Sequence, residues 1–240
     1  MHNPLEQFEI KKLYELSFMG YDISFTNSSL TLLIASLFIM FLLALMVQKS
    51  HMKPGKLQVA LEMFYSTVLD MVESTAGKDG AKYVPLVFTL FIFILSLNLL
   101  GMMPSSFTVT SHIAVTFALA IFIFLLVTTI GFIKHGLHFF SFFLPSGVPV
   151  IMAPLIIPIE LFAYLARPIS LSVRLAANMT AGHIVLKVLA SFAIMAGALG
   201  VIPFALLIAI TGFEFFVAIL QAYIFSILTC VYLSDALNLH

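Results

Sequence analysis

The sequence predicts an all-α polytopic membrane protein. Hydrophobic residues make up 62% of the 240 residues and the mean hydropathy is +1.14, well above the range of soluble domains. The stretch from Ser29 to Val47 is an uncharged run of 19 residues, about the length that crosses roughly 30 Å of hydrocarbon. Charged residues are also absent from the longer stretches 83–133, 136–159 and 188–213. We therefore expect a single membrane domain over 1–240, with about five membrane-embedded helices and one amphipathic surface helix.

The first half of the chain divides into segments of different polarity. We expect an N-terminal segment over 1–27, a first span over 28–48, an amphipathic helix over 54–75, and further spans over 84–101 and 111–133. The N-terminal segment is charged and has no apolar core ahead of the first span, so it is not predicted to be a cleavable signal peptide. A basic cluster follows the first span and indicates a cytoplasmic or matrix-side flank; it comprises Lys49, His51, Lys53 and Lys56.

The segment 54–75 has the pattern of an amphipathic helix. Its apolar residues recur at helical spacing, and its polar residues are displaced from that stripe. The stripe consists of Leu57, Leu61, Phe64, Val68 and Met71, and the displaced residues are Gln58, Glu62, Asp70 and Glu73. We expect this helix to lie along the membrane surface. The alternative is a solvated helix packed on the protein's own loops.

The later connections are rich in turn-forming residues. The first, Gly101-Met-Met-Pro104-Ser-Ser, is uncharged, and a second loop contains Pro145, Gly147 and Pro149. His135 and His138 begin the second loop, but no third ligand is close in sequence, so we expect interfacial polar residues and no metal site. Cys230 is the only cysteine, which excludes a disulfide framework within the chain.

The last third is predicted to form two long helices, over 150–195 and 203–233. The 34 residues from Pro158 to Ser191 would be about 51 Å long as a helix, whereas the hydrocarbon core is only about 30 Å thick. A straight helix of that length would tilt by roughly 50–55°, far from the usual value near 20°. We therefore expect a long, steeply tilted hairpin that packs on another protein or lines water.

Most of the charged residues beyond Tyr83 fall in this hairpin, where each costs about 2.5–3.5 kcal/mol at bilayer depth. At 100° per residue, one helical strip about 40° wide carries four polar side chains: Glu160, Arg167, Arg174 and Asn178. His183 and Lys187 lie on the opposite face. Two polar faces indicate two aqueous environments, or one aqueous environment and one protein partner.

The next helix places Glu214 and Gln221 on one face, seven residues apart. If the hairpin is antiparallel, Glu214 approaches the level of His183. A carboxyl beside an imidazole in a wet cavity is suited to proton relay, because imidazole titrates near neutrality.

Arg174 stays protonated, so it relays protons poorly. It can instead hold an anion, block a proton path, or favour the ionised form of an approaching acid. Simpler interpretations exist for its neighbours: Asn178 and Gln221 as helix–helix hydrogen bonds, and Arg167 as a side chain that snorkels to the interface.

Three stretches resemble a known family. Pro168-Ile-Ser-Leu-Ser-Val-Arg174-Leu-Ala-Ala-Asn178-Met-Thr-Ala-Gly182-His183 resembles the signature helix of subunit a of the F-type, proton-translocating ATP synthase. The stretch from Leu220 to Leu233 resembles that family's last helix, and Asn98-Leu-Leu-Gly101-Met-Met-Pro104 resembles the end of its third helix. The resemblance covers nearly the whole chain.

The resemblance implies the stator half of a rotary proton path. Arg174 would face the carboxylates of a rotor ring of small hairpin subunits and separate two offset half-channels. Glu160 would belong to the half-channel on the catalytic-head side, and His183 with Glu214 to the opposite one. Many bacterial members carry the acid and the histidine in exchanged positions, so this chain looks like the mitochondrial and alphaproteobacterial branch. The location implied is a bacterial inner (plasma) membrane or the mitochondrial inner membrane.

We therefore expect a non-catalytic stator subunit that contacts the rotor ring, peripheral-stalk subunits and the lipid bilayer. The expected proton path uses Arg174, Glu160, His183, Glu214, Asn178, Gln221 and Lys187. The chain has no phosphate-binding loop, no cofactor is expected, and the zero net charge argues against nucleic acid. The alternative is a self-contained proton-coupled secondary transporter, but no internal repeat is visible. A purely structural anchor would leave the charges of the hairpin unexplained.

Overall fold

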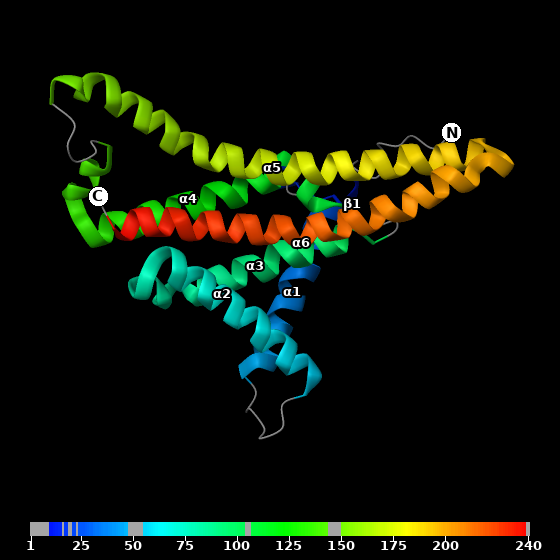
Figure 1. Ribbon diagram of the computed structural model, residues 1–240, viewed down its shortest axis with the longest axis horizontal. Helices are drawn as coiled ribbons and strands as arrows, with labels where there is room; N and C mark the ends of the chain where they lie inside the picture. Colours follow the sequence, from blue (N-terminus) through cyan, green and yellow to red (C-terminus); the bar gives the residue numbers. More distant parts are fainter. Residues whose placement is uncertain are drawn as a thin grey trace. The chain divides into compact units, whose positions relative to one another are not determined.

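The computed structural model describes residues 10–15, 17–18, 21–22, 24–47, 55–103, 107–143 and 150–238 (Figure 1). Its helices are α1 (Asn27–Val47), α2 (Lys56–Gly80), α3 (Val84–Gly101), α4 (Ile113–His135), α5 (Ala153–Met195) and α6 (Val201–Leu237). Short 3₁₀ segments are η2 (Ala81–Tyr83), η3 (Val109–Ser111), η4 (Gly136–Phe143), η5 (Val150–Met152) and η6 (Gly197–Gly200).

The predicted fold class is confirmed. Among the described residues, five helical stretches are long and apolar enough to cross a membrane: Asn27–Ala44, Gln58–Gly101, Ile113–Phe143, Ala153–Met195 and Val201–Leu237. Helix α5 contains 43 residues and α6 contains 37, each well above the roughly 20 that a perpendicular span needs. Pro158 and Pro168 lie inside α5, which continues through both.

The described part of the N-terminal segment forms short strands that the sequence analysis did not predict. Strand β1 (Lys12–Tyr14) pairs antiparallel with β4 (Phe25–Thr26), and β2 (Ser17–Phe18) pairs antiparallel with β3 (Tyr21–Asp22). The Thr26 hydroxyl accepts a hydrogen bond from the Ser29 amide at 3.3 Å, which caps the start of α1. Residues 1–9 and the basic residues Lys49, His51 and Lys53 lie outside the described residues, as do Pro104, Pro145, Gly147 and Pro149.

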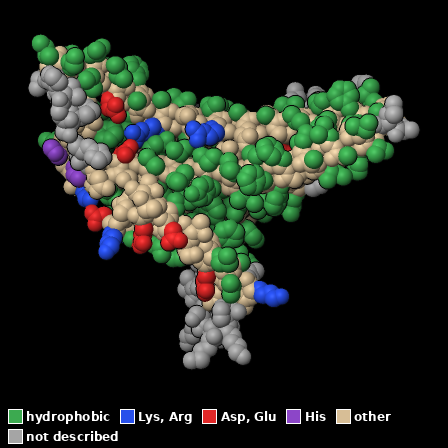
Figure 2. All heavy atoms as spheres, in the orientation of Figure 1, with side chains coloured by type: hydrophobic (Ala, Val, Ile, Leu, Met, Phe, Trp, Pro, Cys, Tyr) green, Lys and Arg blue, Asp and Glu red, His purple; other side chains and the backbone are tan. Residues whose placement is uncertain are grey.

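The amphipathic segment forms α2, which bends at Gly77, a glycine with a φ of 68°. Most of its predicted apolar stripe is buried inside the chain: Leu61, Val68 and Met71 are at most 7% exposed. Tyr65 contacts the Phe88 ring edge-on at 5.5 Å, whereas Phe64 is 40% exposed. Several charged side chains line α2 on the face shown in Figure 2. Its placement along the membrane surface stays a prediction.

The chain divides into two compact units, and α3, α4, α5 and α6 contribute to both. Unit 1 comprises 1–51, 91–115 and 175–223, and unit 2 comprises 52–90, 116–174 and 224–240. Unit 1 has a small core in which Ala35 of α1, Leu97 of α3 and Val109 of η3 are buried. Asn98, which is fully buried, donates a hydrogen bond to the Ala218 carbonyl at 3.1 Å and so joins α3 to α6.

In unit 2, Lys134 at the end of α4 contacts the ends of α2 and α6. Its ammonium donates to the carbonyl of Leu237 at 3.0 Å and lies 3.2 Å from the Asp79 carboxylate. The His135 Nε2 atom also lies 3.2 Å from the Leu237 carbonyl. Cationic side chains at the last carbonyls of a helix satisfy acceptors that have no partner within the helix. His135, considered above as an interfacial residue, thus contacts the end of α6.

Close packing in unit 2 predicts that Gly131→Ala destabilises the protein. A Cβ atom at Gly131 would lie 2.5 Å from Cε2 of the buried Phe139 ring and 3.4 Å from Cβ of Ala236. Overpacking of this kind costs about 1–3 kcal/mol. The measurement is the fraction of assembled subunit that remains after graded heating.

The matched control is Gly212→Ala, because a Cβ at Gly212 meets no atom within 4 Å. Equal heat stability of the two variants would contradict this prediction.

Candidate functional site

Unit 1 contains a cluster of buried polar side chains drawn from α3, the segment around η3, α5 and α6. Each of its members is at most 9% exposed: Asn98, Thr108, Thr110, His183, Glu214 and Gln221. Burial of polar groups costs free energy unless they find partners. A cluster of this kind in such an apolar chain therefore indicates a functional requirement.

His183 and Glu214 face each other at the centre of this cluster. The His183 Nδ1 atom lies 3.6 Å from Oε1 of Glu214, and both side chains are less than a tenth exposed. The structure thus brings together the two residues that the antiparallel hairpin was expected to place at one level. The distance exceeds that of a direct hydrogen bond and suits an ion pair, or exchange through a small movement of either side chain.

Gly182 makes this approach possible. A Cβ atom at position 182 would lie 2.5 Å from Oε1 of Glu214 and 2.9 Å from its Cδ. The carboxyl group of α6 therefore occupies space on α5 that only glycine leaves open. Sequence reasoning did not single out Gly182, because a close approach between two helices leaves no sign in the pattern of either one.

Thr108 contacts the other side of the His183 ring. Its Oγ1 atom lies 3.2 Å from Nε2 of His183 and donates to the Gly101 carbonyl at 3.3 Å. Thr108 was not predicted as a site residue. The signal available was three hydroxyl residues close together, Thr108, Thr110 and Ser111, at the junction between the predicted turn and the predicted span over 111–133.

Several buried polar atoms of unit 1 lack a hydrogen-bond partner among the described residues. They are Oδ1 of Asn98, Oγ1 of Thr110, Nδ2 of Asn178 and both carboxyl oxygens of Glu214. Buried polar atoms are nearly always paired with protein or ordered water. Unpaired buried polar atoms in unit 1, among them both carboxyl oxygens of Glu214, favour a hydrated site.

A second cluster, in unit 2, is built around Arg167. Its Nη1 atom lies 2.8 Å from Oδ2 of Asp235, with the side chains 20% and 30% exposed. The guanidinium lies over three aromatic rings, at 5.6 Å from Phe142, 5.2 Å from Tyr164 and 4.9 Å from Tyr232. Such contacts add cation–π attraction to the ion pair.

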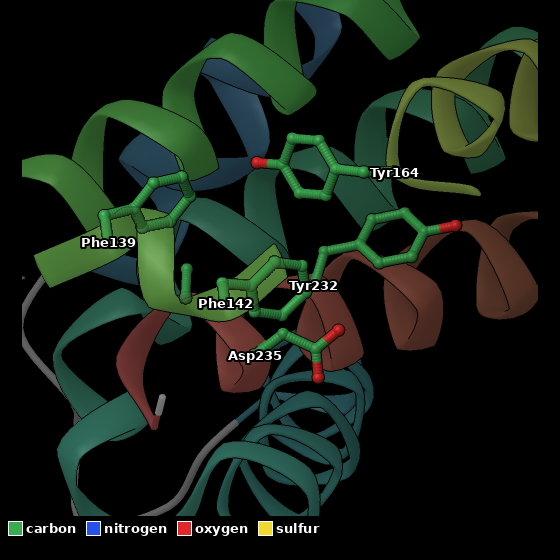
Figure 3. Close-up of a pocket in the computed structure, with 6 residues that line it drawn as sticks. Phe139, Phe142, Tyr164, Tyr232 and Asp235 are labelled. Atoms are coloured by element: carbon green, nitrogen blue, oxygen red, sulfur yellow. The ribbon is translucent and has the colours of Figure 1, made fainter. Parts of the chain in front are cut away.

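The aromatic residues of this second cluster line a small cavity. Phe139, Phe142, Tyr164 and Tyr232 surround it together with Asp235 and Ala236 (Figure 3). The Tyr164 and Thr128 hydroxyls share a hydrogen bond of 2.6 Å, which ties α5 to α4. The cavity measures about 10 Å³, near the minimum that holds one water. The second cluster is therefore tightly packed.

Arg167 is thus paired with Asp235 across the hairpin. Snorkelling of the guanidinium to the membrane interface stays a prediction. Asp235 was not predicted as a partner, although an isolated charge near the end of an apolar helix was a signal that a partner exists.

The remaining predicted residues occupy different environments. Arg174 is exposed, and Ile169 and Val173 on the same stretch of α5 also expose their apolar side chains. Glu160, Asn178 and Lys187 are each half-buried. Among the described residues, Glu160 and Arg174 form no ion pair with each other. The arginine is therefore open to lipid or to another protein.

The fold and the site define a polytopic membrane protein with a buried titratable pair in its last hairpin. A family model described as "ATP synthase A chain" matches residues 29–234. The chain is also 54% identical to ATP synthase subunit a of Rhodospirillum rubrum, over 241 aligned residues that cover 100% of both chains. The chain belongs to the ATP synthase A chain family.

This membership confirms the resemblance described above. The chain is a proton-translocating subunit of the ATP synthase membrane sector, embedded in a membrane and associated with other ATP synthase subunits, while catalysis resides in those other subunits. A self-contained secondary transporter, considered above, does not agree with it.

The partly buried Arg167–Asp235 pair predicts that Asp235→Asn lowers stability by about 1–3 kcal/mol, because hydrogen bonds to charged groups contribute about that much. The variant leaves a guanidinium among aromatic rings without its anion. The measurement is again the heat stability of the assembled subunit.

The control is Asp79→Asn, which removes the carboxylate of the exposed Lys134–Asp79 pair; the Asp79 side chain is 71% exposed. An exposed pair contributes only about 0–1 kcal/mol. If both variants lost the same stability, the distinction between the two pairs would be wrong.

Proposed function

We propose that this chain is the stator subunit that guides protons through the membrane sector along two offset half-channels, so that proton flow drives rotation and ATP synthesis. The observation that carries the proposal is the buried His183–Glu214 pair, whose side chains approach to 3.6 Å while both Glu214 carboxyl oxygens lack a hydrogen-bond partner among the described residues. Family membership supports proton translocation as the function, and the His183–Glu214 pair supports the position of one half-channel in unit 1.

In this half-channel, His183 and Glu214 pass protons between them. Proton transfer needs the two groups within hydrogen-bond reach or joined by one water, and a short movement of either side chain meets that condition. The unpaired atoms of Asn98 and Thr110 are suited to bind water in unit 1, and Asn178 offers its unpaired amide nitrogen on the face of α5 that carries Arg174. Gln221 lies two turns after Glu214 and extends the polar lining. Lys187, one turn after His183, is placed to act on the imidazole electrostatically.

Arg174 separates this half-channel from the second one. It carries a permanent charge and is exposed on an apolar stretch of α5, where a carboxylate of a rotor ring can meet it. A cation favours the ionised form of an approaching acid, so the acid releases its proton there and cannot carry it past the arginine. Each elementary charge that crosses 100 mV delivers about 2.3 kcal/mol, which this separation converts to rotation.

The second half-channel involves Glu160, on the side of the catalytic head. Glu160 is half-buried in unit 2, one helical turn before Tyr164. It offers a carboxylate to protons that leave the rotor. The proposed partners are the rotor ring and peripheral-stalk subunits, in a bacterial inner membrane or the mitochondrial inner membrane.

This proposal predicts that Arg174→Ala permits assembly but abolishes coupled transport. Loss of the fixed charge removes the barrier between the half-channels, so ATP-driven proton pumping falls to background and a passive leak appears. The measurement is proton flux in vesicles that contain the assembled complex, with and without ATP. Normal pumping in this variant would show that the arginine is structural.

The proposal also predicts that Gly182→Ala impairs transport more than stability. The added methyl group displaces the flexible Glu214 carboxyl from His183, so proton flux falls by roughly tenfold or more while the subunit still assembles. The control is again Gly212→Ala, because a Cβ atom at Gly212 meets no other atom within 4 Å. Equal flux in both variants would argue against transfer between His183 and Glu214.

A further inference from the structure

We propose that Thr108 is a positioning residue of the proton path, whose hydroxyl holds the proton of neutral His183 on Nε2 and thereby turns the Nδ1 lone pair toward Glu214. The inference rests on the proposed function and adds a residue outside the predicted hairpin. Thr108 is fully buried, and its Oγ1 atom lies 3.2 Å from Nε2 of His183.

The direction of the hydrogen bonds follows from the single hydrogen of a hydroxyl group. The Thr108 hydroxyl donates that hydrogen to the Gly101 carbonyl at 3.3 Å, since a carbonyl oxygen can only accept. Toward His183 the hydroxyl therefore presents a lone pair, and Nε2 is the donor. In a neutral imidazole, the hydrogen bond made by one nitrogen fixes the protonation of the other, so Nδ1 is left as the proton acceptor.

This tautomer determines which proton moves. Nδ1 faces Oε1 of Glu214 at 3.6 Å. When the Glu214 carboxyl is protonated, transfer breaks its O–H bond and forms an N–H bond at Nδ1, which gives an imidazolium beside a carboxylate. The Nε2–H bond to Thr108 is unchanged. In the opposite tautomer, Nδ1 would already carry a hydrogen and could not receive one from Glu214.

The surroundings of Thr108 hold the hydroxyl in this position. A Cβ atom at Gly101 would lie 2.8 Å from Cγ2 of Thr108, so glycine at the end of α3 makes room for the threonine side chain. The Ser111 hydroxyl donates to the Thr108 carbonyl at 2.6 Å. Both the side chain and the backbone of Thr108 are thus fixed before His183 contacts them.

The charged groups around His183 do not replace this effect. Lys187 lies one turn after His183 on α5, and its ammonium has no hydrogen-bond acceptor to offer the ring. Glu214 faces Nδ1 from α6. A hydrogen-bond acceptor at Nε2 is what selects one neutral tautomer over the other.

The test compares Thr108→Ser and Thr108→Val in the assembled complex. Serine keeps the hydroxyl, whereas valine has the shape of threonine without it. We expect wild-type ATP-driven proton pumping with serine and a decrease of roughly tenfold or more with valine. We also expect nitrogen-15 NMR of the labelled complex to show the Nε2–H tautomer at His183 in the wild type and a mixture in Thr108→Val, with the signal assigned by its loss in His183→Gln.

Gly101→Ala provides a second variant in case valine prevents assembly. It keeps the hydroxyl but displaces the Thr108 side chain, so it is expected to reproduce the mixed tautomer and the slow pumping. An unchanged Nε2–H signal without the hydroxyl overturns the inference, as does an equal defect in serine and valine variants.

The pumping data separate this inference from the proposed function. A tautomer mixture with unchanged pumping overturns the role of Thr108 in the proton path. If Glu214→Gln also pumps normally, the proposed path through His183 and Glu214 fails as well.

Discussion

A charged or titratable group inside an apolar helix needs a partner, and this need determines how α5 and α6 pair in each unit. In unit 1 the partners are His183 and Glu214, and in unit 2 they are Arg167 and Asp235. Each pair takes one member from each helix. Since a lone charge is costly in hydrocarbon, a slip of one helix along the other would separate the partners, so the pairs specify the register of the hairpin.

The two pairs differ in how closely their side chains contact each other and in how many other contacts surround them. Arg167 and Asp235 are in direct contact at 2.8 Å, and aromatic rings cover the guanidinium. His183 and Glu214 are 3.6 Å apart, and neither carboxyl oxygen has a hydrogen bond within the described residues. An arginine cannot give up its proton, so the Arg167–Asp235 pair can only hold the two helices together. An imidazole and a carboxyl can both exchange protons, so the His183–Glu214 pair is chemically able to transfer them.

The helices and the His183–Glu214 pair could be predicted because uncharged runs and helical spacing are local properties of the sequence. The contacts made by Thr108 could not, since they depend on where a loop meets two helices. Asp235 was visible as an isolated charge, but its partner lay 68 residues away in sequence, and helical angles compare residues on one helix only.

Gly101 and Gly182 carry a consequence for sequence variation. Each lies beside a side chain of the proposed proton path, Thr108 in one case and Glu214 in the other, at a distance that excludes a single methyl group. Alanine would preserve hydropathy and favour the helix, so scores based on residue similarity would rate it benign. At these two positions the addition of a single methyl group displaces a side chain of the proposed proton path, so natural variants there should be judged by side-chain volume before chemical similarity.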